Sequence, residues 1–172
     1  MSYFDARKVA LSGILAGVSV ICLFLASVMP TSKLSLYALS SFIVSIIMAE
    51  YGTRAGVVFY ILTSILAFLA VPDKTRIVPY IVFFGVYGII KFHVEKINRI
   101  ILEYVIKILY FNICVAAWLM LFREIFLPED AELKVSLWVV VLVLEAVFIL
   151  YDYVYSLFIQ YYLKRLKKFL KI

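Results

Sequence analysis

Long uncharged apolar stretches alternate with short polar connections along the whole chain. A helix needs roughly 20 apolar residues to cross a hydrocarbon core of about 30 Å, so the pattern predicts six membrane spans in a single domain covering residues 1–172. The expected spans are residues 9–29, 34–49, 55–71, 77–90, 101–122 and 137–163. The second and third are at the short end of a full crossing. We therefore expect an all-α, polytopic membrane bundle.

Composition supports this class and excludes others. Hydrophobic residues make up 66% of the chain and the mean hydropathy is +1.09, whereas a soluble domain is nearer half apolar. The formal charge of +6 is concentrated in the basic tail 164–172, directly after the last span. A cluster in that place favours contact with anionic lipid headgroups over nucleic-acid binding. The two cysteines have neither a disulfide framework nor metal-ligand spacing.

Basic residues in the connections predict the orientation. Eleven Lys and Arg lie at the termini and in the second and fourth connections, against five on the other side. The eleven include Lys91, assigned here to a charged connector over 91–99. By the positive-inside rule both termini are expected in the cytosol, with the protein in the inner (cytoplasmic) cell membrane.

A stripe of small residues marks the start of the chain, ARKVALSGILAG. Ala6, Ala10, Gly13 and Gly17 recur at helical spacing and fall within roughly 60° of arc. Small-xxx-small faces let membrane helices approach each other closely. The stripe is interpreted either as packing inside this bundle or as docking onto another membrane protein.

Ionisable and amide side chains inside the spans are candidate functional residues, because burying them in a membrane is costly. Counted from the outer helix ends, Lys107 and Asp152 lie roughly 22 Å deep, and Asn112 and Glu145 roughly 15 and 12 Å. Two cross-helix pairs at matched depth follow. We expect Lys107 and Asp152 to form a structural ion pair. The pair Asn112 and Glu145 has two interpretations of about equal weight. It forms either a structural hydrogen bond or the floor of an outward-opening ligand cavity.

The predicted outer rim carries a second set of candidate substrate-binding residues. They are Lys33, in the first connection, and Asp73, Lys74, Arg76 and Tyr80, in the proline-bounded segment PDKTRIVPY. Basic side chains at one mouth could recognise a carboxylate or phosphate, or could simply be solvated. The acidic connection 123–136 is likewise a lid or a solvated loop. The tyrosines of the last span indicate an interfacial aromatic belt.

Motifs for catalysis are missing from the sequence. It contains no glycine-rich phosphate loop, no HExxH, and no serine or cysteine with a nearby base. We therefore expect no enzymatic activity, no cofactor and no metal centre.

The layout and the opening stripe resemble the substrate-binding (S) components of energy-coupling factor (ECF) transporters, small bacterial importers of vitamins and metals. The likeness in layout covers the whole chain. The likeness in motif is limited to the spacing of Ala6 and Ala10, which Gly13 and Gly17 extend. It implies that this face docks a transmembrane coupling subunit, and that a separate pair of ATPases supplies the energy. It also implies a pocket for a small molecule in the outward half, closed by the first and third outer connections. The substrate stays unassigned.

A second interpretation is a non-transport membrane scaffold, similar in size and layout to the rod-shape-determining protein D family. Its small stripe would bind a morphogenetic or cell-wall partner, and its bundle would hold no ligand. An outward cavity lined by polar groups favours the S component. A core packed solid by Phe, Leu and Ile favours the scaffold.

Overall fold

The computed structural model describes residues 3–29, 31–97, 99–126 and 137–166. Over these residues the chain is helical and has no β-strand. Six helical segments in this part are long and apolar enough to cross a membrane. The prediction of an all-α chain with six such segments is therefore confirmed.

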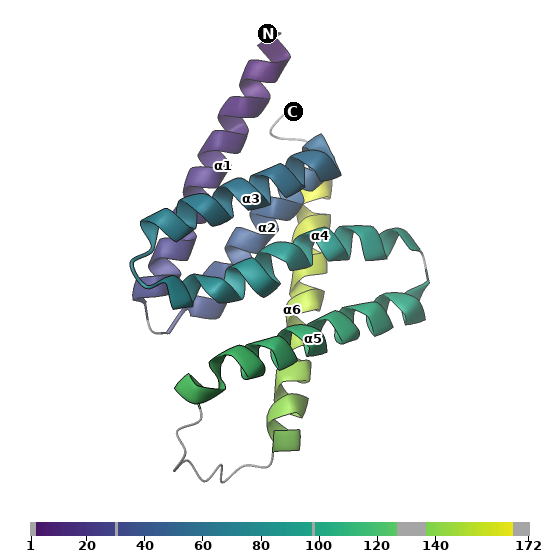
Figure 1. Cartoon of the computed structure of the whole chain (residues 1–172). Coiled ribbons are helices and arrows are strands. Elements are labelled where there is room, and N and C mark those ends of the chain that lie inside the picture. Colours follow the sequence, from purple (N-terminus) through teal and green to yellow (C-terminus); the bar gives the residue numbers. More distant parts are fainter. Residues whose placement is uncertain (1–2, 30, 98, 127–136, 167–172) are drawn as a thin grey trace.

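Each predicted span corresponds to a helix or to a run of short helical segments (Figure 1). The structure has α1 (Tyr3–Val28), α2 (Lys33–Tyr51), α3 (Thr53–Ala70), η1 (Lys74–Ile77), η2 (Tyr80–Phe84), α4 (Gly85–Val94), η3 (Glu95–Ile97), α5 (Ile100–Phe126), α6 (Leu137–Tyr161) and η4 (Tyr162–Leu166). Gly52 alone separates α2 from α3, and its φ of 86° lies in the left-handed region that glycine adopts without steric cost.

The fourth span is longer than the sequence pattern predicted. It runs from Lys74 to Ile97 rather than over 77–90 and combines η1, η2, α4 and η3. Lys91 and His93 therefore lie inside α4, not in a charged connector, and Lys91 is only 2% exposed. The prediction failed because a lysine after an apolar run resembles a span end. Here Asp152 on α6 forms an ion pair with Lys91 inside the bundle.

The bundle is organised around α2, which packs against α1, α3, α4 and α6 (Figure 1). One core cluster fills the space between α2, α4, α5 and α6, and it is largely aromatic: Phe42, Tyr87, Phe111, Phe148 and Tyr155. Close approach of α4 to α2 and α6 depends on Gly88. A Cβ there would lie 2.5 Å from the Tyr155 hydroxyl oxygen and 2.9 Å from the Ser45 Oγ.

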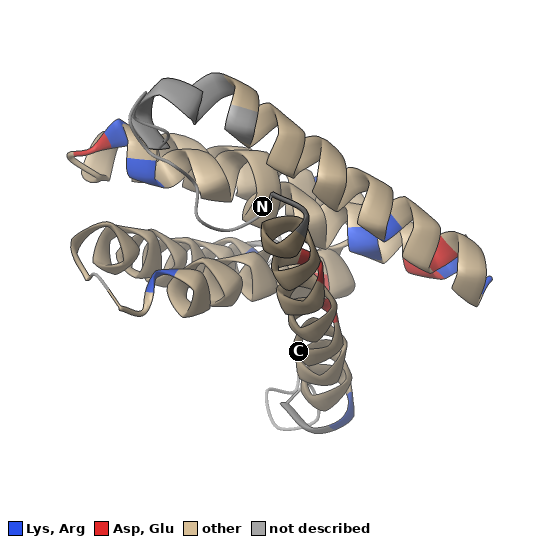
Figure 2. Cartoon of the chain, turned by 90° about the horizontal axis from the view of Figure 1, so that it is seen from below, with Lys and Arg blue, Asp and Glu red and all other residues tan. Residues whose placement is uncertain are grey.

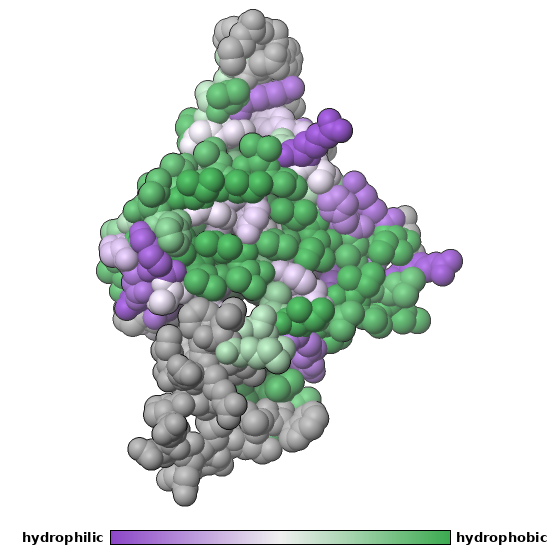
Figure 3. Space-filling view, viewed as in Figure 1, coloured by the Kyte–Doolittle hydropathy of each residue, from purple (hydrophilic) through white to green (hydrophobic). Residues whose placement is uncertain are grey.

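The outer surface is apolar to an extent that suits lipid rather than water. Large apolar side chains are exposed on α1, α3, α5 and α6, with Leu69 and Ile101 73% and 79% exposed. Figure 3 shows a broad hydrophobic band over α3 and α4 with hydrophilic residues gathered toward its ends, and in Figure 2 most Lys and Arg lie near helix ends. Contiguous apolar surface of this extent is unusual for a soluble monomer. The chain is a multi-pass membrane protein by these criteria.

Alternate ends of the helices gather on two sides of the bundle (Figure 1). The start of α1, the α2–α3 and α4–α5 connections and the end of α6 form what we name the terminal side. Two contacts across it are Lys8 over the Tyr51 ring and the Tyr162 hydroxyl donating to Glu50 at 3.3 Å. The α1–α2 and α3–α4 connections form the opposite side, where Arg76 donates to the Ser27 carbonyl.

Candidate functional site

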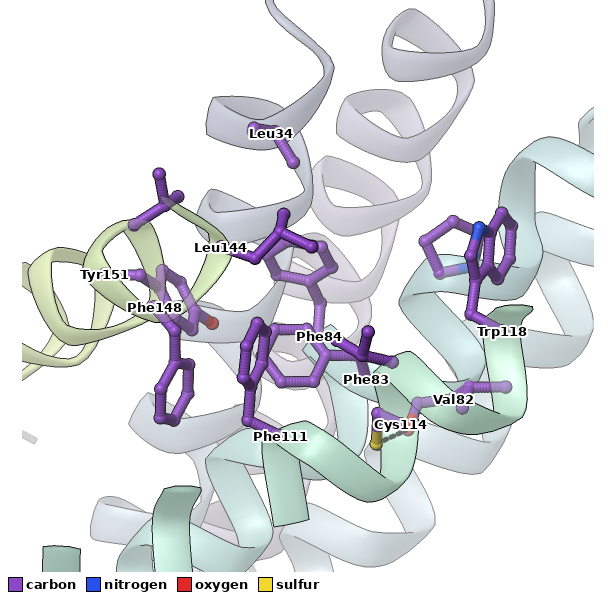
Figure 4. Close-up of a pocket in the computed structure, with 13 residues that line it drawn as sticks. Leu34, Val82, Phe83, Phe84, Phe111, Cys114, Trp118, Leu144, Phe148 and Tyr151 are labelled. Carbon is purple, nitrogen blue, oxygen red and sulfur yellow. Dashed lines mark hydrogen bonds between the residues drawn. The ribbon is translucent and has the colours of Figure 1, made fainter. Parts of the chain in front are cut away.

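A cavity of about 310 Å³ lies in the half of the bundle away from the terminal side (Figure 4). Its walls come from the first turn of α2, the start of the fourth span, the outer part of α5 and α6. The lining residues are Leu34, Pro79, Val82, Phe83, Phe84, Phe111, Cys114, Val115, Trp118, Leu144, Val147, Phe148 and Tyr151. Ligand pockets run from about 300 to 1,000 Å³, so this one suits a small molecule or one group of a larger one.

Aromatic rings shape the cavity, and η2 supplies two of them. This π-helical turn, which begins just after Pro79, carries Phe83 and Phe84. The Phe83 ring lies 5.7 Å from that of Phe111 on α5, which in turn stacks on Phe148 of α6 at 4.5 Å. Single π-turns are frequent at functional sites. Here the turn brings rings from three spans around one space (Figure 4).

The cavity lining is almost entirely apolar. Two of its polar side-chain groups already have partners: the Cys114 thiol donates to the Val82 carbonyl at 3.8 Å, and the Tyr151 hydroxyl donates to Ser41 Oγ at 3.2 Å. The described lining carries no charged side chain. Such a site recognises a ligand by shape and ring contacts, and it disfavours a charged group, which would lose its hydration without a partner.

None of the seven predicted substrate-binding residues lines this cavity. Asp73, at the start of η1, forms a salt bridge with Arg76 at 2.8 Å. The pKa of Asp73 is lowered, first by the hydrogen bond from the Thr75 hydroxyl and next by that from Arg76. Arg76 also donates to the Ser27 carbonyl, and Tyr37 donates to the Arg76 carbonyl. These contacts fasten the α3–α4 connection to α1 and α2.

The other rim residues also have structural partners or positions. Lys74 donates to the Phe68 carbonyl and to the Val71 carbonyl, the latter at 2.7 Å, and so caps the end of α3. Tyr80 is fully buried, with its hydroxyl 3.1 Å from the Thr63 hydroxyl. Lys33 is the first residue of α2 and is half-buried.

Asn112 and Glu145 meet as predicted from their depth. The Asn112 amide donates to Glu145 Oε1 at 3.3 Å and to the Ile108 carbonyl at 3.0 Å. Both side chains are half-buried between α5 and α6. They lie outside the cavity lining, so their contact joins two helices and forms no cavity floor.

A cluster of buried charges joins α4, α5 and α6. Asp152 is 5% exposed and accepts hydrogen bonds from Lys107 at 3.1 Å, from the Tyr87 hydroxyl at 2.5 Å and from Lys91. The predicted contact between Lys107 and Asp152 is therefore present. Glu95 approaches both ammonium groups, at 2.7 Å from Lys91 and 3.2 Å from Lys107. Two positive and two negative charges thus balance, as buried ions require.

Sequence reasoning missed Lys91 and Tyr87 in this cluster. Lys91 was placed in a connector, and its i,i+4 relation to Glu95 was the signal that both belong to one helix. Tyr87 gave no signal, because tyrosine is common throughout these spans. In the last span, Tyr155 and Tyr162 are 1% and 3% exposed, so they belong to the core and not to an interfacial belt.

The small-residue stripe is exposed and does not pack against the other helices. Ala6, Ala10, Gly13 and Gly17 are all exposed, and a Cβ on either glycine would meet no atom within 4 Å. The buried face of α1 is a different one, formed by Ala16, Ser19, Leu23, Ala26 and Ser27. Internal packing of the stripe is therefore wrong for the residues that the structure describes. The acidic connection falls mostly on 127–136, outside those residues, as do the basic residues of 167–172.

No known protein family, curated protein or solved structure matches this chain. Relatives therefore contribute nothing to a functional assignment. The cavity, the stripe and the charge cluster are the features of this chain on which a functional proposal can rest.

Proposed function

We propose that this protein is the membrane-embedded substrate-binding subunit of an ECF-type importer. The observation that carries the proposal is the cavity of about 310 Å³, placed in the half of the bundle farther from the terminal side. A subunit that captures a molecule from outside needs a preformed space in its outward half. The exposed stripe on α1 is the second support, because such a subunit also needs a face for its partner.

The charge bias supports an outward-facing cavity. Without the buried Lys91, ten Lys and Arg remain at or near the helix ends of the terminal side, against five at or near those of the other side. The bias thus survives the correction and favours a cytosolic terminal side in the inner membrane. The cavity then faces outward.

The lining favours an apolar or aromatic substrate. Ring faces from Phe83, Phe111 and Phe148 offer stacking and edge-to-face contacts, and the described lining offers no charged group to a carboxylate or phosphate. The substrate proposed here is therefore a small molecule with a largely apolar body. This differs from the carboxylate or phosphate that was one of the two alternatives for the basic rim residues.

Docking is assigned to the stripe. Ala6, Ala10, Gly13 and Gly17 leave one face of α1 without side-chain bulk, which allows a helix of the coupling subunit to approach closely. Figure 1 shows the N-terminal part of α1 extending beyond the other helices. The ATPases that drive uptake belong to the partner complex, because this sequence carries no phosphate-binding loop.

Capture is tested by extracting small molecules from protein purified from its native membranes and identifying them by mass spectrometry. Wild type is expected to retain a compound that the Leu144→Trp variant lacks, because the larger ring fills the cavity. Leu142→Trp is the matched control, since Leu142 lies on the same helix but is 64% exposed and outside the lining. A compound retained equally by all three proteins, or no compound at all, would remove the support for capture.

The apolar lining also favours the second candidate, a non-transport scaffold similar to the rod-shape-determining protein D family. An apolar space between aromatic rings is compatible with loose packing as well as with a ligand. In that case the stripe binds a cell-wall or shape protein, and no coupling ATPase accompanies the chain.

A further inference from the structure

A groove of about 580 Å³ lies on the terminal side, between α1, the end of α2 and the start of α3. It is separate from the cavity and shares no residue with it. The groove is lined by Lys8, Val9, Ser12, Gly13, Ile47, Tyr51, Arg54, Ala55, Val58, Phe59 and Leu62. Val9 and Val58 are 60% and 64% exposed, so the groove is open along the side of the bundle.

The polarity of the groove changes along its length. Lys8, Tyr51 and Arg54 lie at one end, where α1 enters its span, α2 ends and α3 begins. Leu62 lies eight residues further along α3 than Arg54, which places it roughly 12 Å deeper at 1.5 Å per residue. One end is therefore at the depth of lipid headgroups, and the other is at the depth of acyl chains.

The two basic side chains at the polar end form no salt bridge with any acidic side chain that the structure describes. Lys8 lies 5.9 Å above the Tyr51 ring, and neither Lys8 nor Arg54 takes part in a salt bridge there. Lys91 and Lys107, by contrast, are paired with carboxylates. Two cations that line the polar end of one groove complement a phosphate, which Arg can bind in a bidentate manner and Lys as a point charge.

We propose that this groove binds one anionic phospholipid of the leaflet on the terminal side. Its phosphate lies between Lys8 and Arg54, and one acyl chain follows the apolar part past Gly13 to Leu62. The absence of a side chain at Gly13 gives the chain room, since a Cβ there would meet no atom within 4 Å. The proposal does not depend on transport, and it adds a lipid requirement at Gly13, one residue of the stripe on α1.

The charge requirement is tested by native mass spectrometry of the purified protein in neutral detergent. The protein is titrated with dioleoylphosphatidylglycerol or with dioleoylphosphatidylcholine, which share acyl chains. One phosphatidylglycerol is expected to be retained in preference to phosphatidylcholine. The double variant K8Q/R54Q should bind it at least about tenfold more weakly, since each basic residue near a membrane surface contributes roughly fivefold. The control K96Q/R99Q removes two exposed charges elsewhere on the terminal side and should change the affinity less than twofold.

The shape requirement is tested with two glycines on one helix. Gly13→Leu fills the groove while leaving both charges, and it should weaken phosphatidylglycerol binding. Gly17→Leu adds the same bulk outside the groove and should not. Equal binding of the two lipids, equal effects of K8Q/R54Q and K96Q/R99Q, or equal effects of the two leucine variants would each overturn the proposal. Glycerol phosphate binding as tightly as the lipid would do the same, because it would show a site for a free anion.

Discussion

The charge cluster gives the sharpest test of how this bundle is held together, through the substitution Asp152→Asn. The Asp152 carboxylate accepts hydrogen bonds from Tyr87, Lys91 and Lys107, and it is almost completely buried. The asparagine amide keeps one acceptor oxygen but loses the negative charge, and its NH2 group places a donor against one of the two ammonium groups. The change therefore weakens three contacts between helices and leaves the side-chain volume nearly unchanged.

The expected loss of unfolding free energy follows from two limits. Three interhelical contacts at about 0.6 kcal/mol each give roughly 2 kcal/mol. Leaving a buried charge without its partner costs about 3–5 kcal/mol in soluble proteins. Glu95 remains 2.7 Å from Lys91 and 3.2 Å from Lys107, and its side chain is 42% exposed, so part of the positive charge stays compensated. We therefore expect a loss near the lower limit, about 2–3 kcal/mol.

The assay is reversible unfolding in mixed micelles by titration with dodecyl sulfate, followed by circular dichroism. Glu145→Gln is the control, because it removes one negative charge from the same helix but keeps an oxygen that can accept from Asn112, so it weakens at most the single contact at 3.3 Å. A Lys107→Met substitution in both backgrounds completes a double-mutant cycle. It should cost less when Asp152 is already replaced. An Asp152→Asn loss no larger than that of Glu145→Gln, or effects that simply add, would refute the cluster as described.

Three further predictions follow from particular contacts. Gly88→Ala should lower the unfolding free energy by about 1–3 kcal/mol in the same assay, because its Cβ would lie 2.5 Å from the Tyr155 hydroxyl. Gly13→Ala, the control, should be neutral or stabilising by up to about 1 kcal/mol. Equal stabilities of the two variants would contradict this. Tyr155→Phe removes hydrogen bonds inside the core and should lower unfolding free energy by about 1 kcal/mol, with wild-type stability as the contrary result. Because the pKa of Asp73 is lowered in the folded state, its bond to Arg76 contributes above the ordinary carboxyl pKa and is lost only as pH falls below about 4. Protection of the amides in the α3–α4 connection, measured relative to their intrinsic exchange rate at each pH, should therefore be unaffected by this group above that pH and fall below it, and Asp73→Asn should abolish the change.

Much of the fold was predictable because hydrophobic runs of span length have few alternatives in a membrane. The errors occurred where tertiary contacts overrode local pattern. Lys91 is a charge that a single span could not tolerate, and Asp152, 61 residues later, makes its burial possible together with Glu95. The depth argument for Lys107 with Asp152 succeeded because depth depends only on helix rise, which sequence supplies directly.

The candidate cavity could not be predicted from the sequence, for a related reason. Phe83, Phe111 and Phe148 are aromatic residues among many, and whether rings fill a core or surround a space depends on packing between helices. The charged residues of the rim, by contrast, suggested a binding site that the contacts do not require. Lys74 and Arg76 could serve a ligand on sequence grounds, but both bind backbone carbonyls that end helices. Only the three-dimensional positions of those carbonyls reveal that.

The most direct test of the proposed function is affinity purification of the intact protein from native membranes in mild detergent, with identification of the proteins that accompany it. The proposal predicts a membrane coupling subunit and its ATPases. Both should be lost with Ala10→Trp or Gly17→Trp, which place a large ring on the exposed face of α1, and kept with Leu142→Trp on the lipid-facing side of α6. Recovery of a cell-wall or shape protein in their place, or of no ATPase, would contradict the transporter assignment and leave the scaffold.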